Sequence, residues 1–502
     1  MRVLLVYPDV GVHVNYPVGL GIVSSCLKRE GHEVKVMHLN EEIGFPLEPK
    51  RVMAAFEEFE PELVGFSATS NQYSYVKQLA RMFKESRDVP ILVGGIHTTI
   101  SPSDVIVHPD VDLLCQGEGE FAMLDLVHAL GNGHDLDIGN IWYKANGAVR
   151  HGEVRPLVAD LDVLPFPDRD GFNFGKILEK KRGWANLMAG RGCHYQCTYC
   201  VNNYFHKAYS AVASRGSHLR LRSVDNVLQE VDYLISSFPV KILNFDDDIF
   251  TLNKVWLAEF CEKYAARFKT PFACNARVNI FNRDVAAMLR KAGCVEVKIG
   301  IESGSERLRK AVLRRQTPEP MIRQAFAAAE EAGIRAWSFN MVGLPTETPE
   351  EVMETIRLNA QIRPYILRCS IFFPYHGTDL YEYSEQHGLM DHSKEEAFSS
   401  HLEGTVLNLP DLPPAKIMRY KHMFKWYVDA HSDIEAAPLF QNLVAQFEQL
   451  PDEDWLSGRA VEMVKAMDRH VDKLLRASRK EHYASRKHLD LKYCAALNWR
   501  LP

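Results

Sequence analysis

The first 130 residues alternate short apolar stretches with amphipathic ones, and this alternation constrains the fold more than any other feature. Stretches that favour strands are residues 2–8, 32–40, 63–69, 90–97 and 112–118. Stretches with helical periodicity are residues 19–30, 50–60, 72–86 and 120–130. Successive strand–helix–strand crossovers predict a parallel, doubly wound sheet with helices on both faces.

The loops that follow the first, third, fourth and fifth of these strands are rich in glycine and small hydroxyl residues. The candidate residues in these loops are, in order along the chain, Tyr16, Pro17, Gly19, Leu20, Gly21, Ser67, Thr69, Ser70, Gly94, Gly95, His97, Gly117, Glu118 and Gly119. Doubly wound sheets bind ligands at the carboxyl ends of their strands, and glycine lets a backbone approach a ligand closely. These loops are therefore candidate binding segments. The alternative is that they are tight strand-to-helix turns with capped helices.

A second α/β region follows a hairpin signal with an Asn-Gly turn at residues 141–150 and a linker rich in Pro and Asp. Its predicted strands are residues 185–189, 241–245, 272–275, 295–301, 336–342 and 367–373. Repeated units of this length predict a complete or partial (β/α) barrel, with its chemistry at the carboxyl ends of the strands. From about Glu382 the chain is helical and charged. The predicted division is residues 1–140, 141–183, 184–381 and 382–502.

Bulk properties exclude several classes of protein. At 502 residues the chain is long enough for two or three domains. The net charge of −6 argues against a primary nucleic-acid binder. No apolar run approaches the roughly 18 residues that span a bilayer, and the apolar start is too short for a signal peptide, so we expect a cytoplasmic protein.

The last part of the chain is locally basic, which favours a solvated helix face over an anion or nucleic-acid site. The basic residues are Arg469, Lys473, Arg476, Arg479, Lys480, Arg486 and Lys487.

The chain has ten cysteines, and in a reducing compartment metal binding or catalysis is a commoner use for them than disulfides. Seven are scattered and are interpreted as small buried apolar residues: Cys26, Cys115, Cys261, Cys274, Cys294, Cys369 and Cys494. The other three stand together after a predicted barrel strand.

Cys193, Cys197 and Cys200 have a C-x3-C-x2-C spacing. Thiolates are the usual ligands of iron–sulfur clusters. A structural zinc site would need a fourth ligand, and His194, directly beside Cys193, is poorly placed for tetrahedral geometry. Three ligands for a four-iron cluster leave one iron open, as a catalytic metal requires.

This spacing, after the first strand of a predicted barrel, resembles the radical S-adenosylmethionine superfamily. The resemblance covers about residues 184–380. It implies that the three cysteines hold a [4Fe–4S] cluster whose open iron binds S-adenosylmethionine. One electron, supplied by a flavodoxin- or ferredoxin-type donor, then cleaves this ligand to a 5′-deoxyadenosyl radical.

Softer motifs of the superfamily follow in the expected order. They imply contacts to S-adenosylmethionine from Tyr199, Asp247, Asp248, Asn275, Arg277, Glu302, Ser303 and Gly343. Tyr199 stands directly before the last cysteine, and each of the others stands at or near the end of a predicted strand. The alternative for the acidic run at residues 246–248 is a solvated turn.

A sheet domain before such a barrel resembles the cobalamin-binding branch, which includes methylases and oxygen-independent ring-forming enzymes. The resemblance implies that residues 1–140 bind cobalamin through the loop residues named above. Older cobalamin domains carry a D-x-H-x-x-G segment whose His ligates cobalt, and Asp9-Val10-Gly11-Val12-His13 does not match it. We therefore expect a displaced dimethylbenzimidazole tail and no His on cobalt. His13 and His97 are the residues that could contradict this.

Together these resemblances predict a cobalamin-dependent radical enzyme that methylates an unactivated carbon of a small-molecule substrate. One alternative is an oxidoreductase or cyclase of the anaerobic ring-forming type, without methyl transfer. Another is a sensor that uses cobalamin or the cluster, and the complete run of barrel motifs weighs against it. The cofactors do the chemistry in the leading interpretation, so no separate acid–base constellation is needed.

Overall fold

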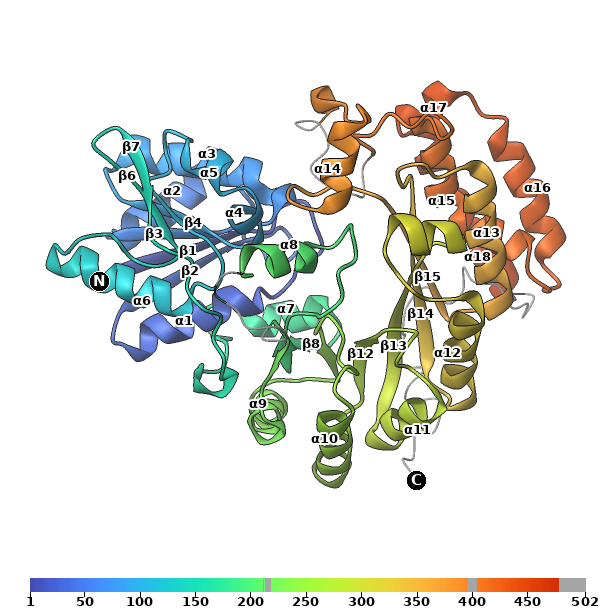
Figure 1. Ribbon diagram of the computed structural model, residues 1–502, viewed down its shortest axis with the longest axis horizontal. Helices are drawn as coiled ribbons and strands as arrows, with labels where there is room; N and C mark the ends of the chain where they lie inside the picture. Colours follow the sequence, from blue (N-terminus) through green and yellow to red (C-terminus); the bar gives the residue numbers. More distant parts are fainter. Residues whose placement is uncertain (211, 213–217, 395–403, 478–502) are drawn as a thin grey trace. The chain divides into compact units, whose positions relative to one another are not determined.

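The computed structural model describes residues 1–210, 212, 218–394 and 404–477 (Figure 1). The chain divides into two compact units, Met1–Tyr195 with Val201–Asn244 and Gln196–Cys200 with Phe245–Pro502. Cys494 and the basic residues after position 477 lie outside the described residues.

The first unit contains a seven-stranded sheet in the order β2-β1-β3-β4-β5-β6-β7. Its strands are β1 (Arg2–Pro8), β2 (Glu33–Leu39), β3 (Leu63–Ser67), β4 (Ile91–Gly94), β5 (Leu113–Cys115), β6 (Ile141–Ala145) and β7 (Ala148–His151). The pairs among β1 to β5 are all parallel, which confirms the predicted doubly wound sheet. β4 and β5 end earlier than predicted, because the chain turns at Gly95 and Gly117, both with positive φ.

The hairpin that the sequence predicted next to the linker extends this same sheet. β6 pairs with β5 and β7 pairs with β6, both antiparallel. Asn146 and Gly147 form the turn with φ of 52° and 76°, as an Asn-Gly hairpin requires.

Helices cover both faces of the first sheet. The longer ones are α1 (Val18–Arg29), α2 (Pro49–Phe59), α3 (Tyr73–Ser86) and α6 (Glu120–Asn132), and the short ones are η1 (Ser70–Gln72), α4 (Ile96–Ile100) and α5 (Pro102–Ile106). α1 packs with α6 on one face, and α2 packs with α3 on the other (Figure 1). The alternating burial along the strands explains this arrangement: Leu4 and Val6 join Phe56 and Phe83 in one core.

The chain then runs through η2 (Leu161–Val163), α7 (Phe174–Lys180), α8 (Val201–Ala208) and α9 (Val224–Ser237). A short antiparallel ribbon, β9 (Gly190–Arg191) with β10 (Arg220–Leu221), brackets the cysteine loop.

The second sheet has six strands in the order β15-β14-β13-β12-β11-β8. They are β8 (Trp184–Leu187), β11 (Ile242–Phe245), β12 (Phe272–Ala276), β13 (Cys294–Glu302), β14 (Arg335–Val342) and β15 (Ile366–Ile371). β12 to β15 pair in parallel. Of the two forms that the sequence left open, this open sheet is the partial barrel.

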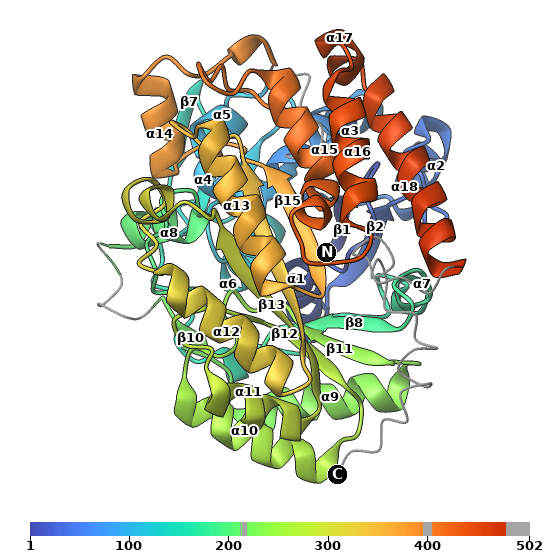
Figure 2. The ribbon, with the colours of Figure 1, turned by 90° about the vertical axis from the view of Figure 1, so that its right-hand side faces the viewer.

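Helices α10 (Lys254–Arg267), α11 (Arg283–Ala292), α12 (Glu319–Glu331) and α13 (Pro349–Ile362) alternate with these strands, and η3 (Leu308–Val312) is a π-helical turn. Figure 2 shows α11, α12 and α13 side by side along the sheet, in agreement with their packing. Asn253, Asn282 and Thr348 accept bonds from first-turn N–H groups, so polar caps fix where α10, α11 and α13 begin.

The C-terminal region is helical, as predicted. It contains α14 (Asp379–Gln386), η4 (His392–Lys394), α15 (Pro414–Ala430), α16 (Ala437–Glu448), α17 (Asp452–Leu456) and α18 (Arg459–Ala477). Trp426, Trp455 and Phe440 are buried and join these helices to the outer side of β14 and β15. Arg469 and Lys473 are exposed on α18. No described helix has the length and apolar character needed to cross a membrane.

Candidate active site

The three clustered cysteines lie on the loop between β9 and α8. Cys193 and Cys197 are buried, Cys200 is partly exposed, and none of the three is in a disulfide. Gly192 has a φ of +84°, and a Cβ there would lie 1.9 Å from the carbonyl oxygen of His218. Only glycine fits directly before the first cysteine, because the backbone there has a positive φ and packs against the carbonyl oxygen of His218.

The part of the loop that carries the other two cysteines is held by Thr198. Its hydroxyl donates to the carbonyl oxygen of Val312 over 2.6 Å, and its own carbonyl accepts from Leu380 N over 3.1 Å. The amide of Cys200 donates to the carbonyl of Cys197 over 3.1 Å. Backbone contacts with η3 and α14 therefore set where Cys197 and Cys200 lie.

Arg277, directly after β12, points at this loop. Its Nη1 donates to the Sγ atom of Cys197 over 3.3 Å, and both side chains are buried. In residues 1–210, 212, 218–394 and 404–477, no three His, Cys, Asp or Glu side chains are gathered at metal-ligand distances. The fit to a cluster therefore rests on donor chemistry: thiols at the right spacing, with an N–H donor to sulfur.

Tyr199 contacts a residue that the sequence did not reveal. Arg315 donates from Nη1 to the Tyr199 hydroxyl over 2.9 Å and from Nη2 to the carbonyl of Gly300 over 2.6 Å. The same guanidinium lies 3.4 Å from Glu302 Oε1. Burial raises the pKa of the Tyr199 hydroxyl well above its usual value, and Arg315 only partly opposes this. Tyr199 is therefore a neutral phenol that joins the cysteine loop to the end of β13.

Glu302 ends β13 with a backbone conformation that few residues other than glycine adopt. Its φ is 69°, and the β13–β14 register shifts between Gly300 and Glu302. A Cβ at Gly300 would lie 2.2 Å from Glu302 Oε1, so this carboxylate folds back over the glycine. Because Gly300 has no side chain, it leaves room for the carboxylate of Glu302.

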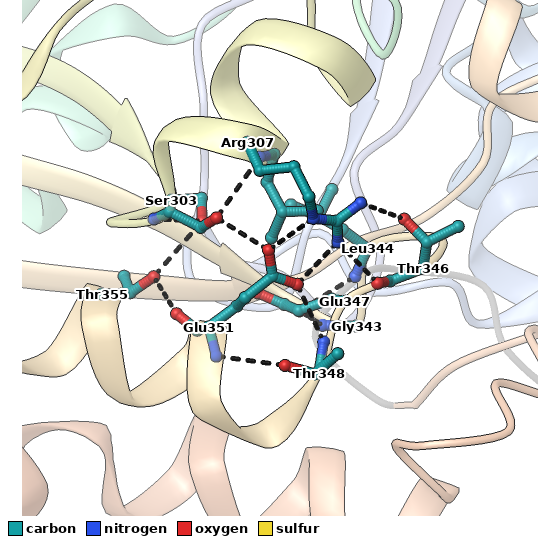
Figure 3. A network of polar contacts seen from close by, with 11 residues as sticks. Ser303, Arg307, Gly343, Leu344, Thr346, Glu347, Thr348, Glu351 and Thr355 are labelled. Carbon is teal, nitrogen blue, oxygen red and sulfur yellow. Dashed lines mark hydrogen bonds and ion pairs between the residues drawn. The ribbon is translucent and has the colours of Figure 1, made fainter.

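A partly buried polar network contains the two predicted contacts Ser303 and Gly343 (Figure 3). The Ser303 hydroxyl lies 3.4 Å from Thr355 Oγ1, and Gly304 N donates to the same oxygen over 2.7 Å. Gly343 N donates to Glu347 Oε2 over 2.7 Å. The side chain of Ser303 and the amide of Gly343 thus have partners within the protein.

The centre of this network is an ion pair between Arg307 and Glu351 (Figure 3). Arg307 Nη2 lies 2.7 Å from Glu351 Oε2 and donates to the carbonyl of Thr346 over 2.8 Å. Glu351 also closes the capping box of α13 with Thr348. The network therefore joins the segment after β13 to the loop after β14.

The acidic segment after β11 is ordered by Asn275. Its Nδ2 donates to the carbonyl of Asp247 over 2.8 Å. Asp247 is buried and Asp248 is exposed, while Asp246 lies 3.9 Å from Lys298 Nζ. The structure therefore brings the predicted Asp247 and Asn275 together, and a wholly solvated acidic turn is not what it contains.

The glycine-rich loops of the first unit all end at the start of a helix. Pro17, Thr69, Gly95 and Gly119 are the N-cap residues of α1, η1, α4 and α6, and none of them makes a side-chain capping bond. Gly19, Leu20 and Gly21 lie in the first turn of α1, and Ser70 begins η1. Capped turns, the alternative interpretation of these loops, would show the polar caps found at α10, α11 and α13.

Two of the predicted cobalamin contacts have a structural role. Tyr16 is buried, and its hydroxyl donates to the carbonyl of Asp168 over 2.7 Å. A Cβ at Gly21 would lie 2.1 Å from that hydroxyl. The pair therefore fixes the linker against α1.

The loops after β3 and β4 approach each other closely. Gly95 has a φ of +98°, and a Cβ there would lie 2.7 Å from Ala68 N and 3.2 Å from Ser67 Oγ. Next to them Gly94 ends β4, and the Thr69 hydroxyl donates to Asn71 Oδ1 over 2.6 Å.

The two histidines that could ligate cobalt, His13 and His97, both lie outside the strands of the first sheet. His97 lies on α4, buried, with Nδ1 3.2 Å from Ser70 Oγ and its ring beside Tyr73. His13 is exposed, and its Nδ1 lies 2.8 Å from Glu42 Oε1. The expectation that no His ligates cobalt stays a prediction.

The loop after β5 carries Gly117, Glu118 and Gly119. A Cβ at Gly117 would lie 1.8 Å from the hydroxyl of Tyr209. The carboxylate of Glu118 is paired with Arg191 and Arg220. Burial opposes the ionisation of Glu118, but the two guanidinium groups outweigh it and lower the pKa of this carboxyl. Sequence reasoning missed these partners, because single Arg and Tyr residues about 70 to 100 positions away carry no periodic signal.

Comparison with known proteins finds a family match for each of two parts of the chain. Residues 187–358 match the radical SAM superfamily, and residues 10–127 match the B12 binding domain. The chain is 30% identical to an uncharacterised methyltransferase of Pyrococcus horikoshii over 402 residues, which are 78% of this chain and 84% of the relative.

Other relatives are more distant. A cytidylyl-2-hydroxyethylphosphonate methyltransferase of Streptomyces wedmorensis is 24% identical, over 66% of this chain and 69% of the relative. An anaerobic magnesium-protoporphyrin IX monomethyl ester cyclase of Rubrivivax gelatinosus is 25% identical, over 76% of this chain and 70% of the relative.

Two solved structures share the fold. The radical S-adenosylmethionine methyltransferase TsrM from Kitasatospora setae has a TM-score of 0.64 at 18% identity, over 77% of this chain and 76% of that chain. The cobalamin-dependent S-adenosylmethionine radical enzyme OxsB has a TM-score of 0.66 at 17% identity, over 91% of this chain and 71% of that chain.

Proposed function

The chain belongs to the cobalamin-dependent radical S-adenosylmethionine enzymes, and from this premise we propose that it is a methyltransferase acting on an unactivated carbon of a small molecule. Its cofactors are a [4Fe–4S] cluster, S-adenosylmethionine and cobalamin. The observation that carries the proposal is the similarity to the P. horikoshii methyltransferase, which extends over 84% of that relative.

Cys193, Cys197 and Cys200 are the proposed cluster ligands. When bound, the cluster supplies the electron that cleaves S-adenosylmethionine to a radical, and cobalamin carries the methyl group. The chain provides mostly buried thiols, and Arg277 stabilises negative charge on the Cys197 sulfur through its N–H group. A flavodoxin- or ferredoxin-type protein is the proposed electron donor.

Tyr199 lies on the cysteine loop, and the other S-adenosylmethionine contacts proposed from the motifs lie on or near β11 to β14. Glu302 and Arg315 present paired opposite charges at the end of β13, where an amino acid ligand with an ammonium and a carboxylate would find complementary groups. Asp247 and Asn275 form a second polar position after β11 and on β12. Their burial keeps water from competing for the ligand.

The proposed cobalamin contacts are the uncapped loops of the first unit. The N-cap residues of α1, η1, α4 and α6 make no side-chain capping bond to the first-turn amides. A phosphate or amide group of a large cofactor can accept from such amides.

A radical cyclase or oxidoreductase is the second candidate, because an anaerobic cyclase is among the relatives at 25% identity. The two differ in their products. A methyltransferase converts one S-adenosylmethionine to S-adenosylhomocysteine when it methylates reduced cobalamin, whereas simple hydrogen abstraction gives only 5′-deoxyadenosine.

The experiment needs no substrate. The chain is reconstituted anaerobically with iron, sulfide and hydroxocobalamin, reduced, and supplied with methyl-labelled S-adenosylmethionine. We expect about four irons per chain, label in the cobalamin and an equal amount of S-adenosylhomocysteine. Cys197→Ala should lose the iron and the 5′-deoxyadenosine, while Cys261→Ala, a buried cysteine on α10, serves as the control. 5′-Deoxyadenosine without S-adenosylhomocysteine would favour the cyclase.

A further inference from the structure

The carboxylate of Glu118, at the end of the β5 loop, has several partners in the first unit. Its Oε1 accepts from Arg191 Nη1 over 2.8 Å and from Arg220 Nη1 over 2.9 Å. Its Oε2 accepts from the backbone N of Val158 over 2.7 Å. The side chain is only 17% exposed. Both oxygens are therefore used inside the protein.

Arg191 forms a second ion pair, with Glu120, in addition to its pair with Glu118. Its Nη2 pairs with Glu120, whose side chain is 4% exposed, so one guanidinium spans two carboxylates of the loop and the first turn of α6. Arg191 and Arg220 are cross-strand partners in the β9–β10 ribbon. Two cations and two anions close this cluster, which we call the Glu118 clamp (Glu118, Glu120, Arg191 and Arg220). Because its charges balance, it is a connection within the protein rather than a site for an ionic ligand.

The clamp lies next to the cysteine loop in the sequence. Arg191 is followed by Gly192, which accepts no side chain, and then by Cys193. A shift of β9 can thus reach Cys193 directly, since only one residue, packed against the carbonyl oxygen of His218, separates Arg191 from it.

The segment after the cysteines contacts the same loop from another side. The Tyr209 hydroxyl occupies the space beside Gly117. His206, on α8, has Nε2 2.7 Å from the carbonyl oxygen of Cys193. The chain before and after the cysteines is therefore packed on one loop, the one predicted to contact cobalamin.

We propose that Glu118 is a positioning residue that couples the cobalamin loop after β5 to the cysteine loop, so that each cofactor raises the affinity for the other. This inference rests on the proposed assignment of the cysteines to the cluster. It also gives Glu118 a different role from the cobalamin contact that the sequence suggested. Coupling of this kind is reciprocal: whatever the cluster does to cobalamin affinity, cobalamin does to the cluster.

The test compares hydroxocobalamin binding, by equilibrium dialysis, to the cluster-loaded and the iron-free full chain. For the wild type we expect the cluster to tighten binding by about fivefold or more, the lower end of ordinary coupling. Glu118→Gln keeps the shape of the side chain but loses its charge. In this variant the ratio of the hydroxocobalamin affinity with the cluster to that without it should fall to about one. Asp125→Asn removes the Asp125–Arg155 pair of the same unit and is the matched control, with an unchanged ratio.

A second measurement reads the coupling from the cluster side. Bound hydroxocobalamin should slow the loss of iron from the oxidised wild-type cluster to a chelator, and it should leave that rate unchanged in Glu118→Gln. Arg191→Lys keeps the charge but cannot span both carboxylates, and should lose most of the coupling if Glu118→Gln proves too unstable to purify.

The outcomes separate the two proposals. A wild type that holds about four irons but binds hydroxocobalamin equally with and without them overturns the coupling and leaves the proposed function standing. Equal ratios in the wild type and Glu118→Gln overturn the role of Glu118. A wild type that takes up no iron overturns the proposed function, and the coupling with it.

Discussion

Arg277 Nη1 donates to the Sγ atom of Cys197 over 3.3 Å, and both side chains are buried. A donor to a ligand sulfur withdraws charge from a cluster and favours its reduced form, because that form carries more negative charge. The residue that the motif suggested as a contact to S-adenosylmethionine thus also lies against the proposed cluster.

Arg277→Met should therefore keep the cluster but make it harder to reduce. A hydrogen bond to a charged group contributes about 1.5 to 3 kcal/mol, and about 59 mV corresponds to tenfold for one electron, so we expect a shift of about 65 to 130 mV to more negative potential. A potentiometric titration followed by electron paramagnetic resonance measures it. Arg283→Met, which removes a surface pair with Glu331, should leave the potential unchanged.

Gly300→Ala tests the place of Glu302. The new methyl group would lie 2.2 Å from Glu302 Oε1, and because this is the end of a flexible side chain, we expect the carboxylate to move rather than the fold to fail. Glu302 then leaves Arg315, and S-adenosylmethionine should bind about tenfold more weakly, which corresponds to about 1.4 kcal/mol.

Isothermal titration of the reconstituted chain measures this affinity. Gly175→Ala on α7, where nothing lies within 4 Å of the new atom, is the control. Wild-type affinity in Gly300→Ala, with an unaltered melting temperature, would contradict the role assigned to Glu302.

The order of strands and helices could be predicted from the sequence because it rests on local periodicity. All six strands of the second sheet were predicted, and their ends differ from the structure by two residues or fewer. The cysteine loop could be predicted for a different reason. The C-x3-C-x2-C spacing lies within eight consecutive residues, and few other kinds of metal site have this spacing.

The partners of the site residues could not be predicted. Arg315 reaches Tyr199 across 116 positions, and Arg220 reaches Glu118 across 102. Such pairs form only when two elements pack, and a single Arg in a polar stretch resembles any solvated residue. Tyr16 is a further example: its place in a glycine-rich loop suggested ligand contact, which stays a prediction, and the sequence did not reveal that its hydroxyl donates to the carbonyl of Asp168 in the linker.

Arg169 is the side chain whose loss should most destabilise the first unit. It is buried, with Nη2 2.8 Å from Glu230 Oε1, Nη1 donating to the carbonyl of Asn186 over 3.0 Å, and its guanidinium over the ring of Tyr16. Arg169→Met leaves a buried carboxylate with one cation fewer, which costs about 3 to 5 kcal/mol. We expect the melting temperature to fall by roughly 10 °C. Arg87→Met, which breaks the exposed pair with Glu60, should change it by about 2 °C or less.

Glu347 should make stability depend on pH. Its Oε2 accepts from the amides of Gly343 and Leu344, its Oε1 is buried without a hydrogen-bond partner in the described structure, and burial raises the pKa of the carboxyl to about 8. Since the folded chain holds this proton more tightly than the unfolded chain, the contribution to stability is complete below about pH 4.5 and is lost as the pH rises toward 8.

Glu347→Gln keeps the acceptor oxygen and has no proton to lose. Its melting temperature should therefore match that of the wild type near pH 4.5 and exceed it by several degrees near pH 8.5. The control is Glu354→Gln, a neighbour on α13 for which we expect the same difference from the wild type at both pH values. An equal difference at the two pH values in Glu347→Gln would show that the carboxyl is already ionised in the folded protein.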